Sequence, residues 1–257
     1  MIPVPAVLQD TAEPPPPPRL GVKLGKVVLR TVDRFFARHS RVPVTPFIDA
    51  KYFPELAPLK AAWRDVDAEL TPLLEARERI PSFHQLSKDQ VRISRGDHWK
   101  TFAFYVFGDR VSENCAQCPR TAALLDALPG IQNAWFSILA PGYHIPPHRG
   151  PSRAVVRCHL GLHIPEAKER CWIRVDNTRA HWSAGEFMCF DDTYEHEVHN
   201  DTDETRVVLF IDLDRPLDRI GRKGCEALLW LMRRSKYVKS SKANLDAWNR
   251  RLGIRAD

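Results

Sequence analysis

Residues 153–162 read RAVVRCHLGL, a β-branched and apolar run that predicts a β-strand. Successive side chains of a strand point to opposite faces. One face is apolar and carries Val156, Cys158, Leu160 and Leu162. Arg157 and His159 share the other face, so the strand is expected to turn both side chains into the same space.

Further runs of the same kind surround this strand. They lie between turn residues at 134–139, 171–175, 186–190, 195–199 and 206–212. Six strands within about 80 residues are typical of a sandwich or a barrel. We therefore expect a mainly β core over about residues 131–216.

Helical patterns flank this core as N-terminal and C-terminal supports. Residues 53–79 repeat apolar side chains at spacings of three and four, and Pro119 suits the first turn of a short helix. Residues 226–232 and 244–252 predict a basic helical tail. We expect a single domain over 43–257, made of a helix-rich part (43–130), the β core (131–216) and the tail (217–257).

The N-terminal region is expected to differ from this domain. Residues 1–19 include the proline run 14–18, which cannot form a helix, and predict a flexible leader. Residues 20–42 predict a basic amphipathic helix. Its segment 20–38 either contacts an anionic membrane peripherally or docks its apolar stripe on the protein.

The net charge of +6 is concentrated at the two ends, with +6 over residues 19–42 and +8 over residues 219–257. No zinc-finger, RNA-binding or phosphate-loop motif accompanies these ends, so we expect no nucleic-acid partner. Neither a signal peptide nor an apolar run of about 18 residues is present in the sequence. The six cysteines, Cys115 and Cys118 among them, are then expected to be reduced thiols. We expect a cytoplasmic protein, either free or peripheral at the inner face of the membrane.

Arginine and histidine side chains point to a ligand site in the β core. Strand alternation places Arg206 inward, as it does Arg157, and two guanidiniums suit a dicarboxylate ligand. His148 and His196 lie 48 residues apart, in the order found in non-haem Fe(II) oxygenases with two histidines and one carboxylate. Gly150 stands where the carboxylate is usually found.

Ordered motifs between residues 99 and 216 add a more specific indication. They are FSILAPG (136–142), PHRGPS (147–152), RCHLGL (157–162), CWIRV (171–175), WSAG (182–185), FDDTYEHEV (190–198) and TRVVL (205–209). Together they resemble the aspartyl/asparaginyl β-hydroxylase family. The resemblance implies a double-stranded β-helix (jelly roll), Fe(II) with 2-oxoglutarate as cosubstrate, and hydroxylation of a C–H bond with release of succinate and CO₂.

The resemblance also implies roles for individual residues. His148 and His196 match the iron ligands and are the expected catalytic metal site. Arg206 and Ser137 match groups that hold the distal carboxylate of 2-oxoglutarate, and Arg157 and His159 match residues near its iron-chelating end. Gly150 matches as well, since the aspartyl/asparaginyl branch lacks the usual carboxylate.

The first expectation for the substrate is an Asp or Asn residue of a peptide or a free amino acid of that type, and a lipid acyl chain is the alternative. Residues 52–63, YFPELAPLKAAW, resemble the bacterial lipid A acyl-chain hydroxylases of the same family. That branch, however, normally keeps an acid where Gly150 stands, and it has an N-terminal membrane segment. Two other classes are a non-catalytic cupin-like binding module, because fold does not fix function, and an iron halogenase.

Overall fold

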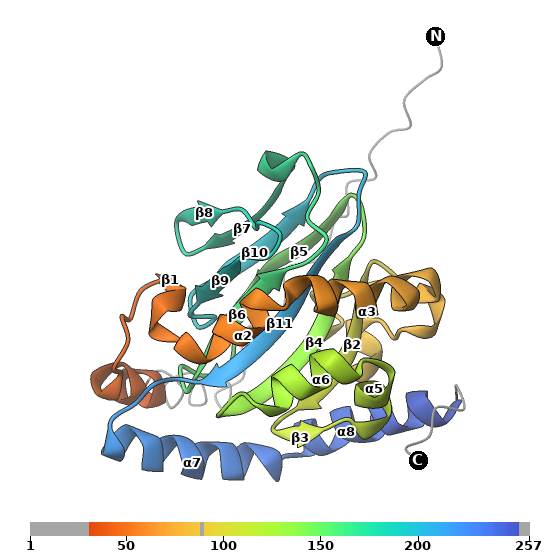
Figure 1. Ribbon diagram of the computed structural model, residues 1–257. Coiled ribbons are helices and arrows are strands. Elements are labelled where there is room, and N and C mark those ends of the chain that lie inside the picture. Colours follow the sequence, from red (N-terminus) through yellow and green to blue (C-terminus); the bar gives the residue numbers. More distant parts are fainter. Residues whose placement is uncertain (1–30, 88–89, 252–257) are drawn as a thin grey trace, which may run out of the picture.

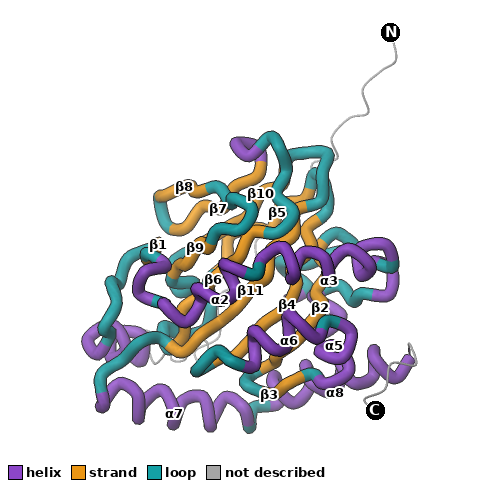
Figure 2. The backbone as a smooth tube through the Cα atoms, in the orientation of Figure 1, coloured by secondary structure: helices purple, strands orange, loops and turns teal. Residues whose placement is uncertain are grey.

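The structure is a computed structural model that describes residues 31–87 and 90–251. Strands form two antiparallel sheets, as Figures 1 and 2 show. The expected leader 1–19, and the first part of the expected basic helix, lie outside the described residues.

The larger sheet has seven strands, in an order that differs from their order along the chain. It runs β1 (Phe47–Ile48), β9 (Phe187–Phe190), β6 (Val155–Gly161), β11 (Arg206–Asp214), β4 (Ile131–Leu139), β2 (Trp99–Val106) and β3 (Asp109–Arg110). The smaller sheet runs β5 (Tyr143–His148), β10 (His196–Asn200), β7 (Cys171–Val175) and β8 (Thr178–Ala180).

The path of the chain through these sheets is that of a jelly roll. From β4 to β11 the chain crosses repeatedly between them: β4, β6, β9 and β11 lie in the larger sheet, and β5, β7, β8 and β10 in the smaller. The central strands of each sheet thus come from distant parts of the sequence. The predicted double-stranded β-helix is confirmed.

Alternation along β11 separates two packed layers. Val207, Leu209 and Ile211 face helices on the outer side of the larger sheet, where they share a core with Val66 and Leu70. These helices are α2 (Ala57–Ala61), α3 (Trp63–Glu75), α5 (Ser112–Gln117) and α6 (Pro119–Asp126), and Figure 1 shows α3 and α6 lying across the strands. Arg206, Val208 and Phe210 therefore face the space between the sheets.

The helical supports are present, with different bounds from those expected. The predicted helix 53–79 is broken into η2 (Pro54–Leu56), α2, α3 and η3 (Arg77–Arg79). The tail consists of α7 (Arg219–Arg233) and α8 (Lys236–Arg251), and α8 contacts α4 (Phe83–Leu86). The part expected to be helix-rich also contains β2, whose side chains are buried on both faces and so lack a polar-apolar alternation.

The basic N-terminal helix is described only from residue 31, and residues 31–39 are helical. There, Val32, Phe35 and Phe36 pack in one cluster with Cys225 and Leu228 of α7. The described part of its apolar stripe is therefore docked on the protein and is not free for a membrane. No helix in the described ranges is long and apolar enough to cross a membrane.

All six cysteines are buried free thiols. Burial raises the pKa of Cys115 to about 11 and that of Cys118 to about 12. A buried, protonated thiol is a poor metal ligand and a poor nucleophile, which agrees with a structural role for this pair.

Candidate functional site

The two histidines expected to bind metal meet between the sheets. His148 ends β5, His196 begins β10, and the two are direct partners across the paired strands. Their ring centroids lie 4.1 Å apart. Strand pairing thus brings together residues that are 48 positions apart in the sequence.

Each imidazole has its Nδ1 engaged and its Nε2 directed elsewhere. His148 Nδ1 lies 2.9 Å from the Pro146 carbonyl oxygen, and His196 Nδ1 lies 3.0 Å from that of Tyr194. A carbonyl can only accept, so each Nδ1 carries the proton and each Nε2 keeps a lone pair. Metal-binding histidines are commonly fixed in this way.

Burial keeps both rings neutral. It lowers the pKa of His148 to about 4, and burial and the neighbouring His148 lower the pKa of His196 well below its usual value. Both side chains are therefore available as metal ligands at neutral pH.

The carboxylate of Asp192 lies against Gly150, close to the histidine pair. A Cβ built on Gly150 would overlap the carboxylate of Asp192, and Gly150 N donates to the Asp192 carbonyl oxygen over 2.7 Å. Asp192 is buried, and its carboxylate forms an ion pair with Arg157. Burial raises its pKa to about 7. The structure thus places the Asp192 carboxylate, from another segment of the chain, in the space beside Gly150.

Arg157 forms ion pairs with two buried carboxylates, those of Asp192 and Asp212. Its Nε donates to Asp212 Oδ1 over 2.9 Å, and one terminal nitrogen lies 2.9 Å from Asp192 Oδ2. Arg157 is inward, as expected, but its guanidinium is paired with protein carboxylates. Its role toward 2-oxoglutarate stays a prediction.

Arg206 differs from Arg157 because it has no acidic partner in the described chain. It is 1% exposed, stacks over Trp182, and donates from Nη1 to the Ser137 carbonyl oxygen over 3.4 Å. Its Nε has no partner among the described residues. Burial lowers the pKa of Arg206 to about 10, so the side chain still carries its charge at neutral pH. A buried unpaired charge of this kind is costly unless an anion binds it.

His159 adds a second unused donor to this space. Its Nδ1 accepts from the indole N–H of Trp182 over 3.3 Å, which leaves the proton on Nε2 of the neutral ring. This Nε2 is buried and has no partner among the described residues. Nearby, Ser137 Oγ accepts from Trp99 Nε1 over 3.0 Å and keeps its own proton to donate. Arg206, His159 and Ser137 thus present donors that suit a carboxylate.

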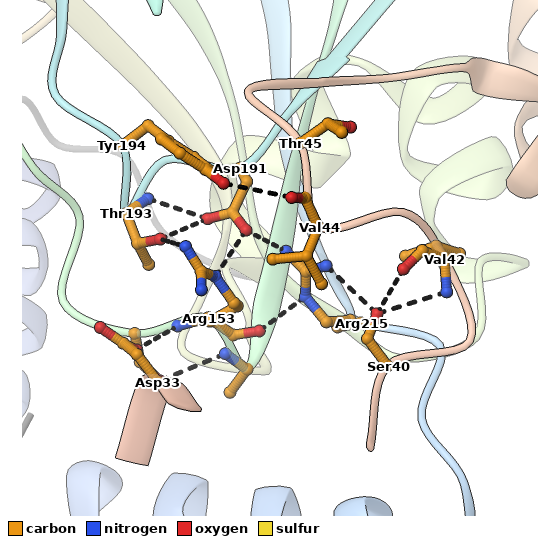
Figure 3. Close-up of polar contacts among 12 residues, drawn as sticks. Asp33, Ser40, Val42, Val44, Thr45, Arg153, Asp191, Thr193, Tyr194 and Arg215 are labelled. Carbon is orange, nitrogen blue, oxygen red and sulfur yellow. Dashed lines mark hydrogen bonds and ion pairs between the residues drawn. The ribbon is translucent and has the colours of Figure 1, made fainter. Parts of the chain in front are cut away.

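A polar cluster that the sequence analysis missed fixes the loops of this site (Figure 3). Buried Asp191 accepts from Arg153 Nε over 2.8 Å, from Arg215 over 2.6 Å and from the Thr193 hydroxyl. Arg153 follows His148 in the chain and Asp191 precedes His196, so the cluster ties the two histidine-bearing loops together. Asp33 joins it by accepting from the Arg153 backbone N–H over 3.0 Å.

A cavity of about 410 Å³ opens beside the histidine pair. Its polar end is lined by His148, Arg149, Arg157 and Asp192. Away from them the lining combines apolar side chains with a few polar ones: Leu86, Ala103, Trp135, Phe210, Met232 and Leu245, and Gln90, Gln132, Asn133 and Ser241. The site can therefore hold an extended apolar molecule whose polar end lies near the histidines.

A different histidine cluster lies on the outer face of the smaller sheet. His144 and His199 both lie within hydrogen-bond distance of Glu197 Oε2, at 2.9 and 3.3 Å. By distance alone these three residues could hold an ion. However, the two imidazoles stack at 3.8 Å with 23° between their planes, so one ion cannot lie near the plane of both. This cluster is separate from the predicted metal site.

Comparisons with known proteins match the chain to one enzyme family by sequence. A family model described as aspartyl/asparaginyl beta-hydroxylase matches residues 60–216. An ornithine lipid ester-linked acyl 2-hydroxylase from Rhizobium tropici is 38% identical over 220 residues, which cover 86% of this chain and 78% of that protein. The aspartyl/asparaginyl beta-hydroxylase of Homo sapiens is 37% identical over 136 residues, 51% of this chain but 18% of the human protein. A Pseudomonas putida prolyl-4-hydroxylase structure matches 73% of this chain and 98% of its own, with a TM-score of 0.39 and 18% identity.

Proposed function

Because the chain belongs to the aspartyl/asparaginyl β-hydroxylase family, and is thus a hydroxylase by descent, we propose that it uses Fe(II) and 2-oxoglutarate to hydroxylate a lipid acyl chain. The observation that carries the proposal is the cavity beside His148, which is lined mostly by apolar surface and carries polar side chains next to this histidine.

The residues present fit both the metal and the cosubstrate. His148 and His196 would hold Fe(II) through their Nε2 atoms, since their Nδ1 atoms are engaged by carbonyl groups. Arg206 would anchor the distal carboxylate of 2-oxoglutarate, because its charge is buried without an acidic partner in the described chain. When bound, the iron and the 2-oxoglutarate would supply the oxygen activation that C–H hydroxylation requires.

The chain itself would orient the substrate and exclude water. Phe210 and Trp135 are among the aromatic side chains that line the cavity. An acyl chain hydroxylated next to its carboxyl carbon would put its ester group near Arg149 and its tail along Ala103 and Leu245. The Rhizobium tropici relative is named for a reaction at this carbon, carbon 2 of an ester-linked acyl chain.

An Asp or Asn side chain is the second candidate substrate. Arg92 and Arg149 also line the cavity and could receive a carboxylate. The apolar side chains deeper in the cavity would then have no substrate group to contact, so the acyl chain fits the described lining better. For the location of the protein, we propose the cytoplasm, since buried free thiols suit a reducing compartment.

The test is an oxygen-dependent turnover assay. Protein loaded with Fe(II) and 2-oxoglutarate without oxygen is exposed to air in the presence of acyl lipids, Asp- or Asn-containing peptides or free amino acids, and products are followed by mass spectrometry. We expect addition of one oxygen to the acyl chain. Oxygen addition to peptides alone would leave the hydroxylase in place and reject the lipid substrate, and addition of chlorine would identify a halogenase.

A further inference from the structure

The outer face of α7 carries large apolar side chains that the fold leaves in solvent. Ile220, Trp230 and Leu231 are 63%, 56% and 62% exposed. The opposite face of the same helix packs inward through Gly221 and Cys225. An amphipathic helix that only covers a core would place polar residues on its outer face. The apolar outer face of α7 therefore indicates a surface that contacts another molecule.

Basic side chains flank these apolar residues. At 100° per residue, the outward half of α7 contains Arg219 and Lys223 beside Trp230 and Leu231, and Arg234, the residue that caps the helix, continues this face. Residues 219–251 contain ten Lys or Arg residues against two acids, Glu226 and Asp246. Aromatic and aliphatic side chains among Lys and Arg are typical of helices that lie in the interface of an anionic bilayer.

Trp230 and Arg234 form a single amphipathic unit at the end of this face. The Arg234 guanidinium lies 3.6 Å from the centre of the Trp230 ring. Tryptophan favours the headgroup level of a bilayer, and arginine pairs with lipid phosphates. This pair could therefore insert a ring while its cation stays among the headgroups.

The same helix also forms part of the wall of the substrate cavity. Leu229 and Met232 of α7 line the cavity from the inner side, next to Leu245 of α8. The outer face and the cavity are thus separated by about one helix diameter, roughly 10 Å. Figure 1 shows α7 along the lower edge of the molecule, outside the sheets.

We propose that the outer face of α7 docks the protein on an anionic lipid bilayer, so that the cavity lies next to the membrane that supplies its acyl substrate. The inference rests on the proposed lipid substrate for its purpose, and on the exposed residues of α7 for its geometry. Charge complementarity selects the partner, because a face with three basic residues and one neighbouring acid, Glu226, favours phosphate-rich surfaces.

Vesicle flotation of the full chain tests the docking without any turnover. Wild-type protein should float with phosphatidylcholine vesicles only when they contain phosphatidylglycerol, and less so as salt rises. The double variant Trp230→Ser/Leu231→Ser should partition about tenfold less, because two interfacial apolar contacts are lost. Tyr52→Ser is the matched control, since Tyr52 is also exposed and beside a lysine but lies on η1 (Ala50–Tyr52), and it should float like wild type.

Other outcomes identify other occupants of this face. Equal flotation of the double variant and the wild type would overturn the proposal. Ultracentrifugation that shows self-association of the wild type, lost in the double variant, would also overturn it and would make the face a dimer interface. Salt-sensitive binding to an oligonucleotide without vesicle binding would overturn it as well. Hydroxylation of detergent-dispersed lipid is measured in parallel: turnover without vesicle binding rejects the docking alone, and vesicle binding without lipid turnover rejects the proposed substrate alone.

Discussion

The backbone of Gly150 and the carboxylate of Asp192 share a space that can hold only one side chain. Any Cβ at position 150 would overlap that carboxylate, although the two residues belong to different loops. Each loop also carries one histidine of the pair, His148 and His196. The arrangement explains why a residue without a side chain fits at the position where iron oxygenases with two histidines and one carboxylate have an acid.

Replacing this glycine should therefore lower both the free energy of unfolding and the affinity for metal. Gly150→Asp is expected to cost about 1–3 kcal/mol of unfolding free energy, since the new side chain has to displace a packed group. It should also weaken Fe(II) binding, because the two loops are forced apart. The double variant Gly150→Asp/Asp192→Gly should recover both properties. Chemical denaturation and anaerobic Fe(II) titration measure them, and a fully stable single variant would mean that the Asp192 side chain moves aside freely.

Arg206 should bind the anionic cosubstrate, and its buried charge should lower the stability of the ligand-free protein. Arg206→Met is expected to leave the ligand-free protein as stable as wild type, or up to about 2 kcal/mol more stable, because a buried unpaired charge is removed. Its affinity for 2-oxoglutarate should fall by about 2–5 kcal/mol. Thermal unfolding with and without 2-oxoglutarate gives both values.

Arg215→Met provides the matched control for Arg206. Arg215 is equally buried but is paired with Asp191 over 2.6 Å, so its loss should destabilise the protein by about 3 kcal/mol. If Arg206→Met proved as damaging as Arg215→Met, Arg206 would be a structural residue.

The two histidines should add little pH dependence to metal binding between pH 7 and 5.5, where Asp192, with its pKa raised by burial to about 7, titrates beside them. A histidine with an ordinary pKa near 6.5 would be about nine-tenths protonated at pH 5.5 and would bind metal about tenfold less firmly. Burial lowers the pKa of His148 to about 4 and shifts that of His196 in the same direction, so both rings stay neutral in this range. Below pH 4 the imidazolium form should exclude the metal. Anaerobic Fe(II) titrations of an Asp192→Asn variant, which lacks the titrating carboxyl, check the histidines across this range, and a tenfold loss by pH 5.5 would contradict the prediction.

The apolar end of the cavity should set the preferred acyl length. Leu245→Trp would fill space opposite Ala103 and is expected to shift turnover toward shorter chains, with unchanged affinity for 2-oxoglutarate. Ala61→Trp adds bulk on the exposed side of α2, away from the cavity and from α7, and should leave chain-length preference as in wild type. Competition between lipids of different chain length measures the ratio, and an unaltered ratio in Leu245→Trp would place the tail elsewhere.

Regular alternation made the main strands of the jelly roll predictable, and it set Arg157, His159 and Arg206 on inward faces. Strand β5 escaped prediction because Pro146 and Pro147 obscure its pattern, and β2 because both of its faces are buried. The pairing of His148 with His196 followed from the family resemblance and not from their spacing.

The partners of the charged residues could not be predicted from the sequence. Arg157 and Arg206 both lie on the inward face of an alternating strand. Asp212 lies opposite Arg157 in the sheet, whereas Leu139 lies opposite Arg206. Which guanidinium is free for a ligand depends on strand register. The overlap of Gly150 with Asp192 likewise requires the three-dimensional course of two loops.

The most direct test of the central claim, hydroxylation of an acyl lipid at the His148–His196 site, is single-turnover reaction under ¹⁸O₂ with quantification of succinate and of labelled lipid. The wild type should give equal amounts of succinate and of acyl chain carrying one ¹⁸O atom, and His148→Ala and His196→Ala should give neither because the metal is lost. Labelled lipid without succinate, or full activity in either histidine variant, would contradict the account.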